Sequence, residues 1–162
     1  LVFMGNIEVE RREEGYVPVE DFTYALPQDM RDSAFVDRVH GVLPGWELPK
    51  IRQVKYHLSQ GYGLASDYFA EILHEMRKES MTAKVARYVE FSDNFTIRDE
   101  RAVKKIVNGL LKLLFPHEEW SKRELRLIMD VAVEYRQRVR DWLHILAPGE
   151  FPKEKLSHVV RN

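Results

Sequence analysis

Pro44-Gly45-Trp46-Glu47-Leu48-Pro49 divides this sequence into two parts of different character. Two prolines and one glycine within six residues end regular secondary structure, because proline lacks an N–H donor and glycine accommodates turns. Short apolar runs precede this turn, and amphipathic periodicity follows it. We therefore predict a small strand-containing part at residues 1–49, a helical subdomain at residues 50–148, and a tail or linker at residues 149–162.

The part before the turn has the pattern of an incomplete α/β sheet. Residues 1–4 form an apolar run that ends at a Gly-Asn turn signal, which is typical of a buried strand. Residues 15–18 fit a loop or an edge strand, residues 27–38 a short helix, and residues 39–43 a second short strand. A buried strand needs neighbouring strands, and this part supplies few of them. We expect a remnant of a larger sheet.

The part after the turn is predicted to be helical. Apolar residues recur at a spacing of three to four over residues 64–76, and residues 81–88 fit a further short helix. Longer amphipathic patterns cover residues 97–115 and 122–146, each followed closely by a proline. Residues from 150 onward are expected to be a frayed or linker segment. The predicted fold class is mainly α with a small α/β remnant.

Two capping boxes begin the longer helices. Thr96 and Asp99 form the first box, and Ser121 and Glu124 form the second. In each box the hydroxyl accepts a hydrogen bond from the amide three residues on, and the carboxylate reaches back to the first amide. These signals fix where the two helices start.

Composition limits the classes of protein. The chain has 162 residues, of which 44% are hydrophobic, and this is enough for one domain-sized core. A net charge of −1 gives no global attraction to nucleic acid or to an anionic membrane. There is no cysteine and no apolar stretch of about 20 residues, so we expect a cytoplasmic protein without a membrane partner. The chain starts inside an apolar run and without Met, which we interpret as a piece of a longer protein.

Most catalytic motifs are missing from this sequence. The six histidines are scattered without metal-ligand spacing, so no metal site is predicted. No nucleophile motif occurs, and no glycine-rich loop with a following lysine is present to hold phosphates. We expect no hydrolysis of ATP or of peptides by this chain alone.

Asn6 and Arg38 are candidate functional residues. Asn6 follows the predicted strand, where ligands bind in α/β sheets, although an asparagine there also simply favours a turn. Arg38 follows Asp37 at the end of the predicted short helix. A guanidinium is always charged and suits a transferring phosphoryl group, but an Asp-Arg pair is also a common surface ion pair.

Arg98 is a third candidate. It lies in the first turn of a predicted helix, where the helix dipole disfavours a cation by a few tenths of a kcal/mol. A phosphate bound jointly by the helix terminus and the guanidinium would compensate for that cost. The alternative is a local ion pair with Asp99 or Glu100.

The last predicted helix is rich in basic residues. Interleaved carboxylates favour a solvated face with i,i+4 pairs, while an exposed basic stripe would indicate a non-enzymatic helical DNA-binding or adaptor module. The basic residues are Lys122, Arg123, Arg126, Arg136, Arg138 and Arg140.

The order of these features resembles the second half of an AAA+ module, from the sensor-1 strand to the helical lid. The run from residue 26 to residue 38, LPQDMRDSAFVDR, and the run LPGWELPK that begins at residue 43 resemble the Lon-like AAA+ ATPases of BREX phage-defence systems, the BrxL family. These are described as ATP-dependent Lon-type proteases. The segments RDxxAV from residue 98, GLLKL from residue 109 and EYRQRV from residue 134 extend the resemblance to about residue 146.

The resemblance implies roles for the three candidates. Asn6 matches sensor 1, which positions the attacking water, and Arg38 matches an arginine finger that reaches the ATP of the neighbouring subunit. Arg98 matches sensor 2 on the lid, which reports nucleotide state. The implied cofactors are ATP and Mg²⁺ in the whole protein, without tight binding to this chain. The implied partners are neighbouring subunits of a homo-oligomeric ring, and DNA in the whole protein.

Overall fold

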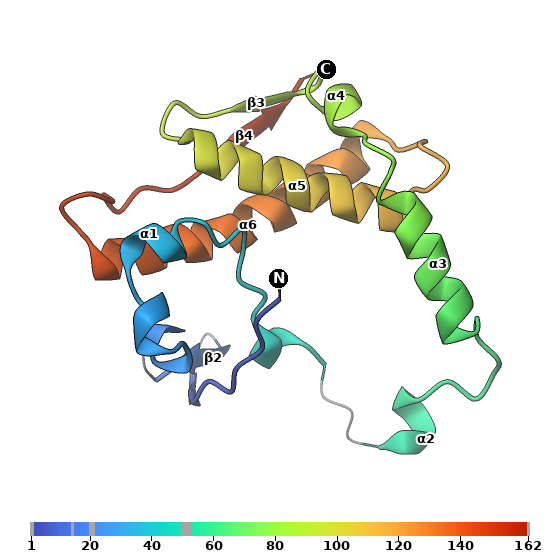
Figure 1. Cartoon of the computed structure of the whole chain (residues 1–162), viewed down its shortest axis with the longest axis horizontal. Coiled ribbons are helices and arrows are strands. Elements are labelled where there is room, and N and C mark those ends of the chain that lie inside the picture. The colour runs from blue at the N-terminus through green and yellow to red at the C-terminus, as the bar shows by residue number, and fades with distance from the viewer. Residues whose placement is uncertain (1, 14, 20–21, 50–52, 162) are drawn as a thin grey trace.

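The computed structural model describes residues 2–13, 15–19, 22–49 and 53–161, and it is rich in helix (Figure 1). The α-helices, in chain order, are α1 (Ser33–Val36), α2 (Val54–His57), α3 (Ser66–Met76), α4 (Thr82–Val85), α5 (Ile97–Leu114) and α6 (Lys122–Leu146). The 3-10 turns are η1 (Phe22–Ala25), η2 (Gln28–Met30) and η3 (Gly45–Glu47). The strands are β1 (Val9–Arg12), β2 (Gly15–Pro18), β3 (Val89–Phe91) and β4 (His158–Val160). A mainly α chain with small sheets is what the sequence predicts.

Helices α5 and α6 are the centre of the molecule, and both begin where the capping boxes predict. The Thr96 hydroxyl accepts from the Asp99 amide at 3.2 Å, and the Asp99 carboxylate accepts from the Thr96 amide at 2.9 Å. Ser121 and Glu124 repeat this arrangement at the start of α6. Each box satisfies backbone donors that the first helical turn leaves unpaired.

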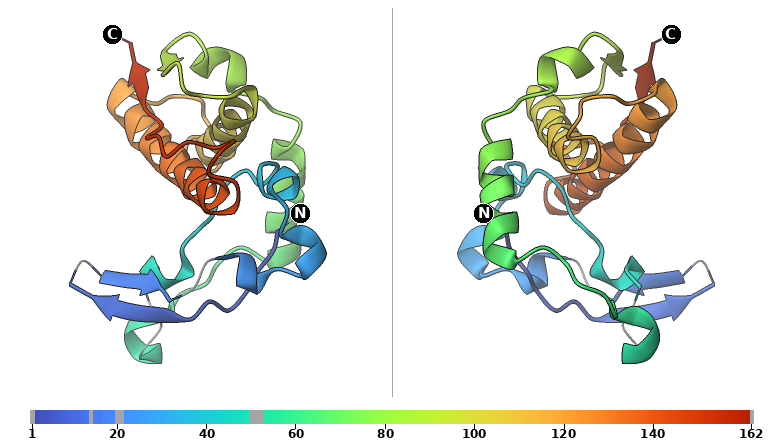
Figure 2. Two further views of the ribbon diagram at one scale, coloured as in Figure 1. Left: turned by 90° about the vertical axis from the view of Figure 1, so that its left-hand side faces the viewer. Right: turned by 90° about the vertical axis from the view of Figure 1, so that its right-hand side faces the viewer.

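The main hydrophobic core lies between α5 and α6, with α4, β3 and β4 packed on it (Figures 1 and 2). Val103, Val107 and Leu111 of α5 are fully or almost fully buried, because they recur at a spacing of four on one face. Leu125 and Met129 of α6 lie opposite. Leu113 and Leu114 at the end of α5 are exposed, so the buried stripe does not include every leucine of the helix.

A second core joins the N-terminal part to the other half of α6. Val36 of α1 is 0% exposed and packs with Val139, Trp142 and Leu143 of α6 and with Phe151. This contact places the end of α1 directly against the long helix (Figure 1). The predicted boundary between residues 49 and 50 stays a prediction.

The C-terminal segment is ordered, and the expectation of a frayed segment after residue 150 is wrong. β4 pairs antiparallel with β3, with Val160 opposite Val89 and His158 opposite Phe91. Leu156 and Val160 are 3% and 6% exposed, respectively. The segment returns along the α5–α6 pair and covers its core, a long-range pairing that local sequence does not encode.

The two predicted N-terminal strands are not formed. Residues 2–8 and 39–43 have no regular structure, whereas residues 15–18 are indeed a strand, β2, in a hairpin with β1. A strand requires a neighbouring ladder, and among the described residues neither run is part of one. Val2 and Met4 are correspondingly 89% and 95% exposed. The predicted short helix at residues 27–38 is present only as η2 and α1.

α3 confirms the helix predicted at residues 64–76 but buries none of its residues. Figure 1 shows it leaving the α5–α6 pair, with Tyr68 and Phe69 59% and 46% exposed. Among the described residues, no helix is long and apolar enough to cross a membrane.

Candidate functional site

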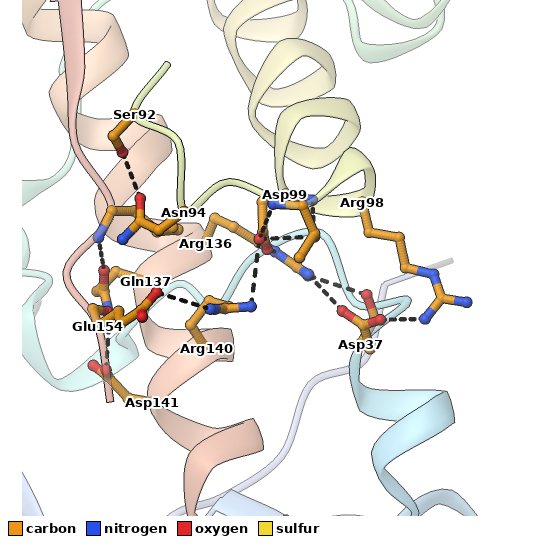
Figure 3. A network of polar contacts seen from close by, with 12 residues as sticks. Asp37, Ser92, Asn94, Arg98, Asp99, Arg136, Gln137, Arg140, Asp141 and Glu154 are labelled. Atoms are coloured by element: carbon orange, nitrogen blue, oxygen red, sulfur yellow. Dashed lines mark hydrogen bonds and ion pairs between the residues drawn. The ribbon is translucent and has the colours of Figure 1, made fainter. Parts of the chain in front are cut away.

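A buried arginine on α6 organises the most polar part of the interior (Figure 3). The side chain of Arg136 is 0% exposed. Its Nε donates to a carboxylate oxygen of Asp99 at 2.6 Å, and one terminal nitrogen donates to a carboxylate oxygen of Asp37 at 2.8 Å. Charge-assisted hydrogen bonds of this kind compensate for taking a guanidinium out of water. Arg136 therefore joins α5 and α6 to the end of α1.

The remaining terminal nitrogen of Arg136 binds backbone. It donates to the carbonyl oxygen of Asp37 at 3.2 Å and to that of Val39 at 2.5 Å. These two residues flank Arg38 in the chain. The buried guanidinium thus contacts the backbone on both sides of the predicted finger residue.

Arg38 itself is exposed, although its neighbours are held. Its guanidinium donates to the carbonyl oxygen of Ala34, one helical turn back in α1. Asp37, by contrast, is 6% exposed. The Arg38 side chain therefore lies at the surface, while the backbone on both sides of it is hydrogen-bonded to the buried Arg136.

The segment that follows Arg38 lies close to α6. The Val42 amide donates to the Tyr135 carbonyl oxygen at 3.1 Å. A Cβ added at Gly41 would lie 2.9 Å from the Cβ of Tyr135 and 3.1 Å from Cδ1 of Ile106. Glycine is needed here, because any side chain would push the segment away from the helices. This close packing restricts how far residues 37–42 move relative to α6.

Arg98 reaches the same carboxylate from outside. It donates to the second carboxylate oxygen of Asp37, while its side chain stays 53% exposed (Figure 3). This hydrogen bond is the largest cause that raises the pKa of Arg98. The local partners considered from sequence, Asp99 and Glu100, are not used: Asp99 binds Arg136 and Glu100 binds Lys104.

Asp99 serves two functions at once. One carboxylate oxygen, Oδ2, caps α5 and lies 3.6 Å from a guanidinium nitrogen of Arg140. The other, Oδ1, accepts a hydrogen bond from Nε of Arg136. Asp99 is 0% exposed. Two guanidinium groups and the Thr96 amide of the cap therefore surround this carboxylate and compensate for its burial.

Asn6 is not part of this cluster. It is exposed in a segment without regular structure, so it does not follow a strand as predicted. Within the described ranges, no hydrogen bond or ion pair links it to Arg38 or Arg98. Of the other two candidates, Arg98 binds Asp37, which directly precedes Arg38, while the Arg38 side chain binds the carbonyl of Ala34.

The prediction of a solvated basic face on α6 is wrong for two of its members. Arg136 and Arg140 are 0% and 5% exposed, and Arg138 binds Glu47 and Glu134. One continuous exposed basic stripe on α6 is therefore not formed, which removes the feature on which the DNA-binding alternative depended.

The sequence patterns did not predict that Arg136 and its partners form a buried cluster. The signal was its place in the helical pattern: Arg136 lies three residues after Val133 and three before Val139, on the buried face of α6. An arginine at an apolar position of an amphipathic helix indicates a buried carboxylate elsewhere in the fold. In the part of the chain that the structure describes, no group of three or more His, Asp or Glu residues could hold a metal ion.

Comparison with known proteins identifies the class to which this arrangement belongs. A family model described as the ATPase domain of Lon-like protease BrxL-like proteins matches residues 1–157. The chain is 37% identical over 159 residues to a Lon-like protease BrxL of Escherichia coli O9:H4 (strain HS), which covers 98% of this chain and 22% of that protein. It is 36% identical over 160 residues to a Lon-like protease BrxL of Bacillus cereus (strain H3081.97), covering 98% of this chain and 23% of that protein.

The family model and the relatives place the chain in the class of Lon-like ATPase domains. The chain belongs to the BrxL family, the Lon-like ATPases of BREX type. It spans less than a quarter of the length of the two curated relatives.

Proposed function

We propose that this chain is the nucleotide-sensing and coupling half of a Lon-like AAA+ ATPase subunit, which works within a homo-oligomeric ring. In this proposal Arg38 is an arginine finger for the ATP of the neighbouring subunit, Arg98 is the sensor-2 arginine of a helical lid, and Asn6 is sensor 1. The energy of ATP turnover would be used by the whole protein on DNA or on a protein substrate.

One observation carries the proposal: Arg98 and Arg38 are linked through Asp37. Arg98 is fixed at the start of α5 and binds the Asp37 carboxylate, and Asp37 directly precedes Arg38. A change in what Arg98 binds therefore alters the support of the residue next to the finger. A coupling device needs a physical contact of this kind between two sites.

The residues present fit the phosphate side of an ATP site. Arg38 and Arg98 are exposed guanidinium groups, and such groups stabilise the charge that develops on a transferring phosphoryl group. ATP with Mg²⁺ would supply the reacting phosphate and its counter-ion in the whole protein. This chain would contribute the cations that approach from the lid and from the next subunit.

The first test is Arg38→Ala in a full-length subunit that carries this sequence. We expect the kcat of ATP hydrolysis to fall about 10³-fold or more, because the charge on the transition state loses its guanidinium. Binding of a fluorescent ATP analogue should stay within about twofold of that of the unmodified subunit. Steady-state phosphate release and analogue titration measure the two quantities.

Arg123→Ala is the matched control, because Arg123 is exposed on α6 and makes no ion pair or hydrogen bond among the described residues. Its ATPase activity should equal that of the unmodified protein. If Arg38→Ala retains full ATPase activity in assembled rings, the finger assignment is wrong.

A further inference from the structure

The buried guanidinium of Arg136 has a geometry that a purely structural ion pair would not need. Two of its nitrogens are used by the carboxylates of Asp99 and Asp37. The third donates to two backbone carbonyls, of Asp37 and Val39, which lie on either side of Arg38. An arginine can do this because its donors are held in one rigid plane.

We propose that Arg136 is the positioning residue for Arg38, so that the lid helix α6 sets the place of the arginine finger. This inference rests on the function proposed for Arg38. Arg136 touches no nucleotide in this role. It acts by holding the backbone from which Arg38 projects.

The surrounding contacts favour positioning over simple filling of space. Asp99 is itself fixed by the α5 capping box, and it holds the Nε end of the guanidinium. Gly41 and Val42 keep the following segment against α6. The backbone around Arg38 is thus held in place by contacts that involve both α5 and α6, while the Arg38 side chain remains exposed. A misplacement of about 1 Å at a catalytic group costs on the order of 10²-fold in rate.

Arg136→Lys in the full-length protein is the test variant. Lysine keeps the positive charge between Asp37 and Asp99 but cannot present a planar fork to the two carbonyls. We expect kcat to fall about 10-fold to 100-fold, with the KM for ATP within about twofold and ring assembly unchanged. Arg138→Lys is the control, because Arg138 is also an ion-paired arginine of α6 but binds Glu47 and Glu134 instead.

A double-mutant cycle distinguishes positioning from general damage. If Arg136 acts through Arg38, Arg136→Lys has no further effect once Arg38 is alanine. Single-turnover hydrolysis of radiolabelled ATP measures the slow rates of the Arg38→Ala background. An equal fold-loss in both backgrounds, or an unchanged kcat in Arg136→Lys alone, overturns the positioning role.

Two further outcomes distinguish a failure of the role proposed for Arg38 from a failure of the positioning role of Arg136. If Arg38→Ala itself leaves kcat unchanged, the proposed function fails, and this inference fails with it. If Arg136→Lys does not assemble, the same cycle is run with Asp99→Asn, which removes the negative charge that holds the Nε end of Arg136. A loss of kcat that disappears in the Arg38→Ala background then supports positioning, and a loss that persists contradicts it.

Discussion

Asp37 is the residue whose carboxylate binds two arginines of the helices α5 and α6. One carboxylate oxygen binds the buried Arg136, and the other binds the exposed Arg98. A phosphate near Arg98 would compete with Asp37 for that guanidinium, because both ligands are anions. In the proposed function, Arg98 would then exchange one anionic partner, Asp37, for another, the phosphate.

Removing the Asp37 side chain should be costly. In Asp37→Ala the fully buried Arg136 loses one of its two carboxylates, so we expect the free energy of unfolding to fall by about 3 kcal/mol. Glu47→Ala is the matched control, since Glu47 also pairs with an α6 arginine but its side chain is 50% exposed. That change should cost less than about 1 kcal/mol. Urea unfolding of both variants gives the two free energies. Equal losses would contradict the claim that the buried ion pair contributes more to stability than the exposed one.

Among the elements, α5 and α6 carry most of the organisation. Their starts are defined by capping boxes, and their facing sides form the main core. The remaining helices are short or largely exposed, so their stability depends on what they pack against. Helix α6 contributes to both cores and to the buried charge cluster, which makes it the element that links the parts of the chain.

Loss of a cap should weaken α6 measurably. Ser121→Ala removes the hydroxyl that accepts from the Glu124 amide, and we expect a loss of about 1 kcal/mol in the free energy of unfolding. The same hydroxyl is the main cause that lowers the pKa of Glu124. Ser66→Ala is the control, because Ser66 begins α3 without a side-chain cap, and it should change stability by less than about 0.5 kcal/mol. Thermal unfolding followed by circular dichroism reports both, and equal effects would argue against the cap.

At the scale of the whole molecule, the C-terminal segment packs back onto the main core. β4 pairs with β3, and Nε2 of His158 on β4 lies 3.4 Å from Oδ1 of Asp130 on α6. Burial lowers the pKa of His158 below its ordinary value of 6.5; Asp130 opposes this change and Arg126 adds to it. The return of the segment thus places a histidine where its neutral form is favoured.

This arrangement predicts a pH dependence of stability. Because the folded-state pKa is lowered, the unfolded chain binds more protons below pH 6.5. The contribution of His158 is therefore complete above pH 6.5 and is lost as the pH falls below that value. We expect His158→Gln to reduce the loss of unfolding free energy between pH 7.5 and pH 5.5, and exposed His74→Gln to leave it unchanged. Urea unfolding at the two pH values measures it, and identical pH dependence in all three proteins would refute the prediction.

Local sequence patterns were enough to predict the mainly α class, the starts of α5 and α6, and the family resemblance that the comparison confirms. Capping boxes and amphipathic periods act over three or four residues, so a local reading captures them. The same reading selected Arg38 and Arg98 as candidates, and their roles remain proposals.

Which charges are buried, and how the terminal segments pack, depends on the tertiary structure. Asp37 lies 61 residues from Arg98 and 99 residues from Arg136 in the chain, yet all three meet in one cluster. The pairing of β3 with β4 and the unpaired run at residues 2–4 likewise depend on whether a partner strand lies alongside. Burial and strand pairing are properties of distant neighbours, which a local pattern does not specify.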